Sequence, residues 1–420
     1  MKPSRSTSSD AEIAWRPLLA WVLGALFFCY GYVQRVSPSV MVAELMRDFA
    51  AGAALLGHLS AFYLYAYAPI QVPVGVMMDR IGPRRLMAGA TALAAAGSLI
   101  FAMSEVLAGA YLGRFLIGAG AAFSWVGVLT VISQWFPPAR FALFSGITQA
   151  IGMTGAIFGQ APLSFAVAAI GWRGALAAIA AAGFGLAALI WLVVRDRPHA
   201  ATASVSIAGG LAAVLRNRET WLNAVFGLAM AGPMLGFAAL WAVPYLMTVY
   251  GLDRATAASM ASLLFVGWAI GAPVIGFASD RIGRRRMPMI IGAAVATVTL
   301  VAILYVPGLT LPFLGALLVV HGAAGSTMVL AFASVREHNK PGTGGSAMGF
   351  VNMAVVGSGA LFQPLIGLLL DLNWDGALAA GARVYSPGTY GLALSVLPVG
   401  CAIGLAASLS MKESFARQRP

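Results

Sequence analysis

Long apolar runs alternate with short polar segments along the whole chain. Each run has about 20 residues or more, which is the length that an α-helix needs to cross a bilayer and is too long for a barrel strand of about 10 residues. The polar segments contain Gly, Pro or clusters of charge. We expect twelve membrane-spanning helices, at 17–41, 53–78, 84–104, 107–136, 141–170, 173–194, 220–249, 255–279, 285–306, 310–335, 343–370 and 387–410. The pattern therefore predicts an all-α membrane protein.

The composition supports lipid as the solvent of this chain. Of its 420 residues, 60% are hydrophobic and 10% are charged, which exceeds what the core of a soluble protein needs. The first run is too long for a signal peptide and lacks a small-residue cleavage site, so we expect a retained helix. Cys29 and Cys401 fall inside predicted spans. We therefore expect no disulfide framework, no metal site and no cofactor.

The positions of the basic residues explain the net charge of +12. If the spans alternate in direction, all but six of the 26 Lys and Arg residues lie on one side of the membrane. The exceptions are Arg47, Arg173, Arg254 and Arg383 in opposite-side loops and Arg35 and Arg114 inside spans. The positive-inside rule then places both termini in the cytoplasm, in a bacterial inner membrane. The charge favours anionic lipid as a partner and does not indicate nucleic acid.

The chain divides into two similar halves. We expect a tail at 1–16, a six-helix bundle at 17–194, a cytoplasmic linker at 195–219, a second bundle at 220–410 and a tail at 411–420. The pattern G-x-x-x-D-R-x-G-x-R-R follows the second predicted span at 75–85 and recurs after the eighth at 276–286. A doubled half suits a carrier, because a site between two similar bundles can open to either side.

This doubled pattern resembles the loop motif of the major facilitator superfamily. Arg114-x-x-x-Gly118-x-Gly120 is similar to a second motif of that family, and the small residues at 152–162 are loosely similar to a third. The resemblance implies twelve helices in two pseudo-symmetric six-helix bundles. It also implies that the loop residues gate the conformational change, namely Asp79, Arg80, Arg84, Asp280, Arg281 and Arg285. Pro83 departs from the motif, and the alternative role of these charges is the positive-inside signal alone.

Few ionisable residues lie within the predicted spans. All 14 acidic residues fall in tails, loops or helix ends, whereas Arg35, Arg114 and His321 lie inside spans. Charged groups inside a membrane are costly and often functional. Two guanidiniums without a carboxylate predict a positive site for an organic anion. The alternatives are that Arg35 reaches the lipid headgroups, that Arg114 bonds main-chain carbonyls, and that His321 is a packed neutral group and not a proton carrier.

The segment around Arg35 resembles the Tyr-x-x-Asp-Arg segment of the anion:cation symporters. The resemblance implies that Arg35 contacts a substrate carboxylate. Gln34 stands where those symporters have an acid, so their proton mechanism does not carry over. We expect further pocket residues among polar and aromatic side chains, although each is also suited to helix packing: Tyr30, Gln34, Tyr63, Tyr67, Gln71, Trp125, Gln149, Trp241, Tyr245, Trp268, His321 and Asn352.

These observations predict a monomeric secondary transporter that moves a small organic anion by alternating access, coupled to protons. The chain shows no nucleophile paired with a base and no phosphate-binding loop, so we do not expect an enzyme. Residues 241–246 and Arg35-x-x-Pro38 also resemble, loosely, bacterial intraphagosomal amino-acid transporters. Amino-acid or other small-metabolite transport is therefore an alternative, as is export of drugs or metabolites.

Overall fold

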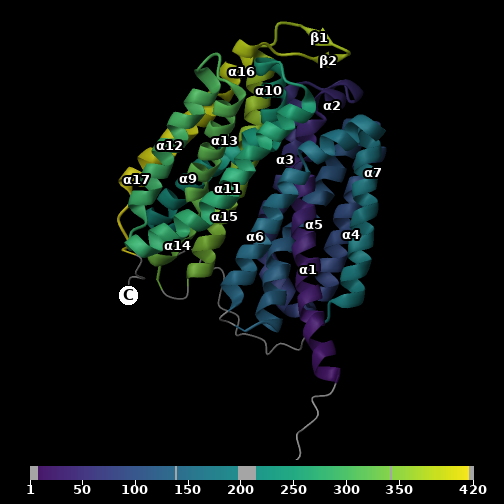
Figure 1. Cartoon of the computed structure of the whole chain (residues 1–420), viewed down its shortest axis with the longest axis vertical. Coiled ribbons are helices and arrows are strands. Elements are labelled where there is room, and N and C mark those ends of the chain that lie inside the picture. The colour runs from purple at the N-terminus through teal and green to yellow at the C-terminus, as the bar shows by residue number, and fades with distance from the viewer. Residues whose placement is uncertain (1–7, 138–139, 197–213, 341–342, 416–420) are drawn as a thin grey trace, which may run out of the picture.

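Helices account for most of the chain and form two groups that stand side by side (Figure 1). The computed structural model describes residues 8–137, 140–196, 214–340 and 343–415. The N-terminal half contains α1 (Ser8–Val36), η1 (Ser37–Val40), α2 (Val42–Asp48), α3 (Ala53–Ile81), α4 (Pro83–Met103), α5 (Leu107–Trp135), α6 (Phe141–Phe158) and α7 (Ala161–Val193). Most of the predicted linker, at 197–213, lies outside the described residues.

The second half repeats this helical pattern and adds a small hairpin. It contains α9 (Arg218–Gly232), η3 (Pro233–Trp241), α10 (Ala242–Tyr250), α11 (Arg254–Ile282), α12 (Arg286–Tyr305), α13 (Leu311–Gly325), η4 (Ser326–Met328), α14 (Val329–Glu337), α15 (Gly344–Leu372), β1 (Leu378–Ala379), β2 (Ala382–Arg383), α16 (Pro387–Leu394) and α17 (Val396–Ser410). Strands β1 and β2 pair antiparallel. The all-α architecture of two helical bundles is confirmed.

The described residues include 11 apolar helical stretches that are long enough to cross a membrane. One of them, Leu143–Val193, has 51 residues and covers two predicted spans. Gly171 divides it, because its φ of 71° is a conformation that glycine adopts without a steric penalty. The chain turns back at this residue, between the predicted helices 141–170 and 173–194. The predicted turn is therefore in the right place, although the helix is also interrupted at Gly159–Gln160.

Three predicted helices are less regular than expected. The first ends at Val36 and not at residue 41, because Pro38 opens a short 3-10 turn, and the expected loop after it contains helix α2. The seventh widens into the π-helix η3, which begins at Pro233. The tenth is interrupted at η4, where the hydroxyl groups of Ser326 and Thr327 donate to carbonyls three residues earlier and compete with the helical ladder.

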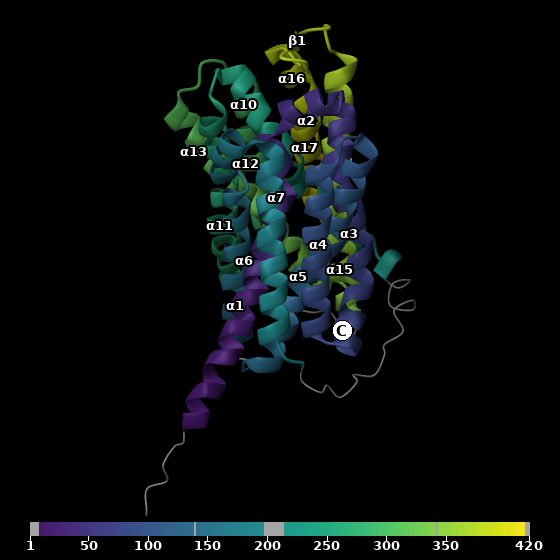
Figure 2. The same cartoon turned by 90° about the vertical axis from the view of Figure 1, so that its right-hand side faces the viewer.

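The two ends of the molecule differ in what they carry. We call the end with α2, β1 and β2 the hairpin end. We call the opposite end, where α1 begins and the described chain finishes, the terminal end (Figures 1 and 2). The loops at Gly82 and Gly283, which belong to the repeated motif, join helices at the terminal end. The helices thus run from one end to the other, and the motif loops share the end at which the described chain begins and finishes.

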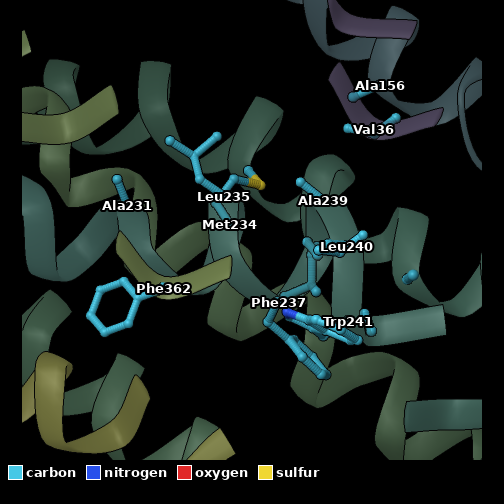
Figure 3. Packing of buried hydrophobic residues seen from close by; sticks show 14 of the residues in the cluster. Val36, Ala156, Ala231, Met234, Leu235, Phe237, Ala239, Leu240, Trp241 and Phe362 are labelled. Carbon is cyan, nitrogen blue, oxygen red and sulfur yellow. The ribbon is translucent and has the colours of Figure 1, made fainter. Parts of the chain in front are cut away.

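The π-helix η3 lies at the centre of the C-terminal half. Every residue of η3 is buried, and the Trp241 indole donates a 3.0 Å hydrogen bond to the carbonyl of Gln363 in α15. Phe362 of α15 packs against this segment, since a methyl group at Gly236 would lie 2.8 Å from its Cβ atom, and Figure 3 shows Phe362 among the buried residues of this cluster. η3 therefore ties the seventh predicted span to the eleventh.

Helices α3 and α15 join the two halves. A methyl group at Gly57 of α3 would lie 2.5 Å from the carbonyl oxygen of Gln363. A methyl group at Gly367 of α15 would collide with the carbonyl of Ala53 in the same way. Only glycine permits this backbone approach, which is closest along the part of α3 nearest the hairpin end.

Candidate anion site and the contacts between the halves

Arg35 is held in a cage of tyrosine rings in the last turn of α1. Its side chain is buried, with 8% of the residue exposed. The guanidinium carbon lies 4.5 Å from the ring centre of Tyr32, 5.3 Å from that of Tyr63 and 5.0 Å from that of Tyr67. The electron-rich ring faces attract the cation. The Nε–H has no hydrogen-bond partner, and no carboxylate among the described residues pairs with Arg35.

Two of the caging tyrosines come from one face of α3, where they are four residues apart. The rings of Tyr63 and Tyr67 are 5.9 Å apart and nearly parallel. The Tyr63 hydroxyl donates to the carbonyl of Gly31 in α1 at 3.2 Å, and Gln71, one turn further, donates to the carbonyl of Ala122 in α5 at 3.0 Å. These bonds connect α3 to α1 and α5. They hold the cage rigid on the side that faces Arg35.

Arg114 also lies near the ring of Tyr63 and is bound to main-chain carbonyls. It is 1% exposed, and its guanidinium carbon is 5.2 Å from the Tyr63 ring centre. Its nitrogens donate to the carbonyl of Gln34 at 2.6 Å, of Ser60 at 3.0 Å and of Leu59 at 3.4 Å. Two buried cations thus lie near one ring, but only Arg114 has the carbonyl partners that compensate a buried donor.

Tyr30 and Gln34 lie on a different face of α1. The Gln34 amide oxygen accepts a hydrogen bond from Ser98 of α4, and its Nε2 has no partner. The Tyr30 hydroxyl lies against Gly183 of α7, where there is no room for a larger residue. Both side chains therefore point into the N-terminal bundle, away from the cage around Arg35.

Tyr32 belongs to the site, although we did not predict it from the sequence. Its ring packs edge-on against Phe28 at 5.1 Å, and Phe28 lies 5.0 Å from Trp125 of α5. Phe28, Tyr32 and Arg35 are spaced by four and three residues, so they lie on one face of α1. That spacing is the signal that would have identified Tyr32. A continuous row of rings therefore leads from Trp125 to the guanidinium.

The predicted residues of the C-terminal half mainly bond within that half. Tyr245 donates to the carbonyl of Ile303 at 2.9 Å, and Trp268 packs against Gly325. The Nδ1 of His321 lies 3.0 Å from the hydroxyl of Thr299 and 3.1 Å from the carbonyl of Ala296, both in α12. Asn352 of α15 is half-buried, as is Gln149 of α6 in the N-terminal half. None of these residues contacts Arg35 in the part of the chain that the structure describes.

The charged loops of the repeated motif form networks within each half. The Arg84 main-chain N–H donates to Asp196 at 2.8 Å, and its Nε donates to the Trp191 carbonyl at 2.8 Å. Arg80 and Arg281 are exposed, and the side chain of Asp79 lies outside the described residues.

In the second half, Arg285 bridges Asp280 at 2.5 Å and Glu337 at 3.0 Å. Burial alone would lower the pKa of Arg285, but these two carboxylates outweigh it and raise the pKa. The guanidinium is therefore fixed in its charged form, and its partners lie in the same bundle.

Asp371 of α15 caps the first turn of α3 across the contact between the halves. Its carboxylate accepts the N–H of Ala53 at 3.0 Å and that of Ala54 at 2.9 Å. The Tyr385 hydroxyl donates to it at 2.6 Å, and Arg383 pairs with it at 3.1 Å. A carboxylate at a helix N-terminus binds free N–H groups and the positive end of the helix dipole. This cap holds the halves together at the hairpin end.

Each of the four basic residues expected in opposite-side loops has an acidic partner at the hairpin end. Arg254 pairs with Glu44 across the halves, and Arg383 pairs with Asp371. Arg47 and Arg173 both pair with Asp48. Burial tends to raise the pKa of Asp48, but hydrogen bonds from Trp172, Arg173 and Arg47 outweigh it and lower the pKa. These four arginines share three carboxylates, so the pairs leave a formal charge of only +1 at this end.

Comparison with known proteins identifies the fold and the family. The computed structure resembles a bacterial homolog of the human lysosomal transporter Spinster, in an inward-facing and unoccupied conformation, with a TM-score of 0.78, 17% identity, and coverage of 96% of this chain and 99% of that one. It also resembles a nucleoside transporter with a TM-score of 0.74, 15% identity, and coverage of 94% and 100%.

Relatives in sequence include transporters of organic acids. A probable galactarate/D-glucarate transporter of Pseudomonas putida is 27% identical over 31% of this chain, which spans only 28% of that relative's length. A gentisate transporter of Corynebacterium glutamicum is 25% identical over 86% of this chain and 83% of its own length. The family model described as Major Facilitator Superfamily matches residues 23–253 and 233–386. With matches over both halves, the chain belongs to the major facilitator superfamily.

Proposed function

We propose that this chain is a secondary transporter that moves a small organic carboxylate by alternating access, and that Arg35 binds the carboxylate. The observation that carries the proposal is the buried guanidinium of Arg35, whose Nε–H has no partner and which no described carboxylate neutralises. A buried charge without a carboxylate partner is costly. A substrate carboxylate that accepts from the guanidinium fork would remove that cost.

Burial argues against the alternative role for Arg35. An arginine that reaches for lipid headgroups leaves its guanidinium at the membrane surface, whereas Arg35 is only 8% exposed and is enclosed by three rings. The rings fix the plane of the guanidinium, but they accept hydrogen bonds from its N–H groups less strongly than a carboxylate does. We assign Arg114 a structural role, because main-chain carbonyls already accept from its nitrogens.

The named relatives support an anionic substrate. They include the transporters of galactarate or D-glucarate and of gentisate, a probable L-galactonate transporter of Escherichia coli and a probable sulfoacetate transporter of Cupriavidus necator. Each of these compounds carries an acid group. A site with a buried arginine and no described acid suits this class of substrate better than a cationic drug, whose recognition favours a buried carboxylate.

Alternating access accounts for the position of the contacts between the halves. The caps and ion pairs at the hairpin end hold the halves together there, and the described bonds of Arg84 and Arg285 at the terminal end stay within each half. We propose that the terminal end is cytoplasmic, because it carries the basic loops. Proton coupling is part of the proposal, with His321 as the candidate carrier, since its imidazole is an ionisable group inside a predicted span.

A ligand screen with matched variants tests the proposed function. The purified protein is mixed with sugar acids, aromatic acids and the neutral amide of each, and the melting temperature is measured. A ligand that binds only the folded state raises it. We expect at least one acid to stabilise the parent and not Arg35→Gln. Arg216→Gln, which removes an exposed charge, is the control and should respond as the parent does. Equal stabilisation by acids and amides would contradict the proposal.

A further inference from the structure

A small cavity opens at the terminal end, outside the site around Arg35. It has a volume of about 150 Å³ and lies between the beginning of α1, the end of α5 and the end of α7. Arg16, Ala20, Trp135, Val193 and Arg195 line it. Since a water molecule occupies about 30 Å³, the cavity has room for a phosphate group.

The lining combines two cations with an apolar floor. Arg16 and Arg195 are both exposed, and neither forms an ion pair with a described carboxylate. The guanidinium of Arg16 lies 5.5 Å from the ring centre of Trp15. No acidic residue lines the cavity. An anion that enters it would meet two guanidiniums, with Ala20, Val193 and the Trp135 indole beneath it.

We propose that this cavity binds the headgroup of an anionic phospholipid, with the phosphate between Arg16 and Arg195. The surrounding surface is suited to the rest of a lipid, because Leu18 on α1 is 48% exposed and Leu192 on α7 is 70% exposed. Both belong to apolar helices that are long enough to span a membrane. A basic pocket between the ends of such helices is a known type of lipid-headgroup site, and indole rings favour the same depth.

The cavity adjoins the first loop of the repeated motif. Arg195 precedes Asp196, whose carboxylate accepts the main-chain N–H of Arg84 and lies against Gly82. Gly82 has a φ of 91°, so the loop depends on a conformation that favours glycine. A lipid held by Arg195 would therefore lie next to the hydrogen bond between Asp196, which follows α7, and Arg84, which follows the loop between α3 and α4.

Native mass spectrometry of the purified protein with defined lipids tests this inference. The probes are phosphatidylglycerol, phosphatidylcholine and inorganic phosphate. We expect the protein to retain phosphatidylglycerol tightly and to retain neither phosphatidylcholine nor inorganic phosphate. The double variant Arg16→Gln/Arg195→Gln should bind it about 30-fold more weakly, and each single variant about fivefold, since one basic residue near the surface contributes on that scale. Arg281→Gln/Arg284→Gln, which removes two exposed charges from the other half, should bind as the parent does.

Three results would overturn the inference. Unchanged retention of phosphatidylglycerol by the double variant would place the lipid elsewhere. Equal retention of phosphatidylcholine would show that the headgroup charge does not matter. Displacement of phosphatidylglycerol by millimolar inorganic phosphate would identify a site for a free anion. Because both arginines are exposed, the variants should fold, and an unchanged melting temperature verifies this.

Discussion

Replacing Asp371 with alanine should loosen the contact between the halves at the hairpin end. In the computed structure, its carboxylate accepts N–H groups from Ala53 and Ala54 of the opposite half, and Tyr385 and Arg383 complete its shell. Alanine removes these acceptors, and water can reach the freed N–H groups only if the halves separate. The state closed at the hairpin end should therefore lose stability relative to the state that is open there.

The size of the effect follows from the individual contacts. Removing an N-cap side chain costs about 0.5–2 kcal/mol. The pair with Arg383 does not change the balance between the two states, because both residues belong to the C-terminal half and the substitution removes their pair in either state. The expected loss is therefore at most about 2 kcal/mol, or roughly 30-fold in the ratio of the two states.

Distances between spin labels measure this shift directly. Glu105 and Pro307 are exposed loop residues of the two halves at the hairpin end, and labelled cysteines at these positions in a background without Cys29 and Cys401 report the opening. In Asp371→Ala the distribution should shift to longer distances.

Asp375→Ala is the matched control for this experiment. It removes an exposed carboxylate whose described bond, to the N–H of Ala377, is local. Its distance distribution should stay that of the parent. Identical distributions for Asp371→Ala and the parent would refute the assignment of Asp371 as a contact that holds the halves together.

Three further predictions concern residues outside the cage. Arg114→Lys should lower the melting temperature, because each buried carbonyl that is left without a donor costs about 1–3 kcal/mol of stability. An unchanged melting temperature would contradict a structural role for Arg114. If His321 carries the coupled proton, His321→Asn should abolish the pH dependence of uptake in vesicles, and an unchanged pH profile would exclude it. Asp280→Asn should slow transport more than it weakens equilibrium binding, because its partner Arg285 lies at the terminal end; equal losses in both would contradict a gating role.

Much of the fold could be predicted because lipid imposes simple rules on the sequence. Apolar length and Gly or charged boundaries located the helices, and the repeated motif divided the chain into halves. The exact course of the helices could not be predicted in the same way. The break at η4 depends on where two hydroxyl groups donate, and the π-helix η3 depends on packing against Phe362 of a distant segment.

The candidate site was predictable only in part. Arg35, Tyr63 and Tyr67 were selected by type and position, and the structure brings these three together. Tyr30 is about one turn from the cage along α1, yet its side chain faces α7. Successive residues of a helix point in different directions around its axis, so residues that are close in sequence can lie on different faces.

The contacts at the hairpin end could not be predicted from the sequence for another reason. The pairs Glu44–Arg254 and Ala53–Asp371 join residues more than 200 positions apart. The sequence showed only that Arg254 and Arg383 departed from the charge asymmetry, without naming their partners. Which acid lies opposite each arginine depends on how the two halves dock, and periodicity within a helix carries no information on that.

Binding of one carboxylate to the parent and to Arg35→Lys is the measurement that tests the central proposal most directly. The substitution keeps the positive charge and removes the planar fork, so it separates recognition of a carboxylate from simple charge attraction. Losing one charge-assisted hydrogen bond costs about 1.5–3 kcal/mol, so calorimetry should give a dissociation constant roughly ten- to a hundredfold higher for Arg35→Lys, at an unchanged melting temperature without ligand. Equal affinity in the two proteins would contradict the assignment of Arg35 as the group that binds the carboxylate.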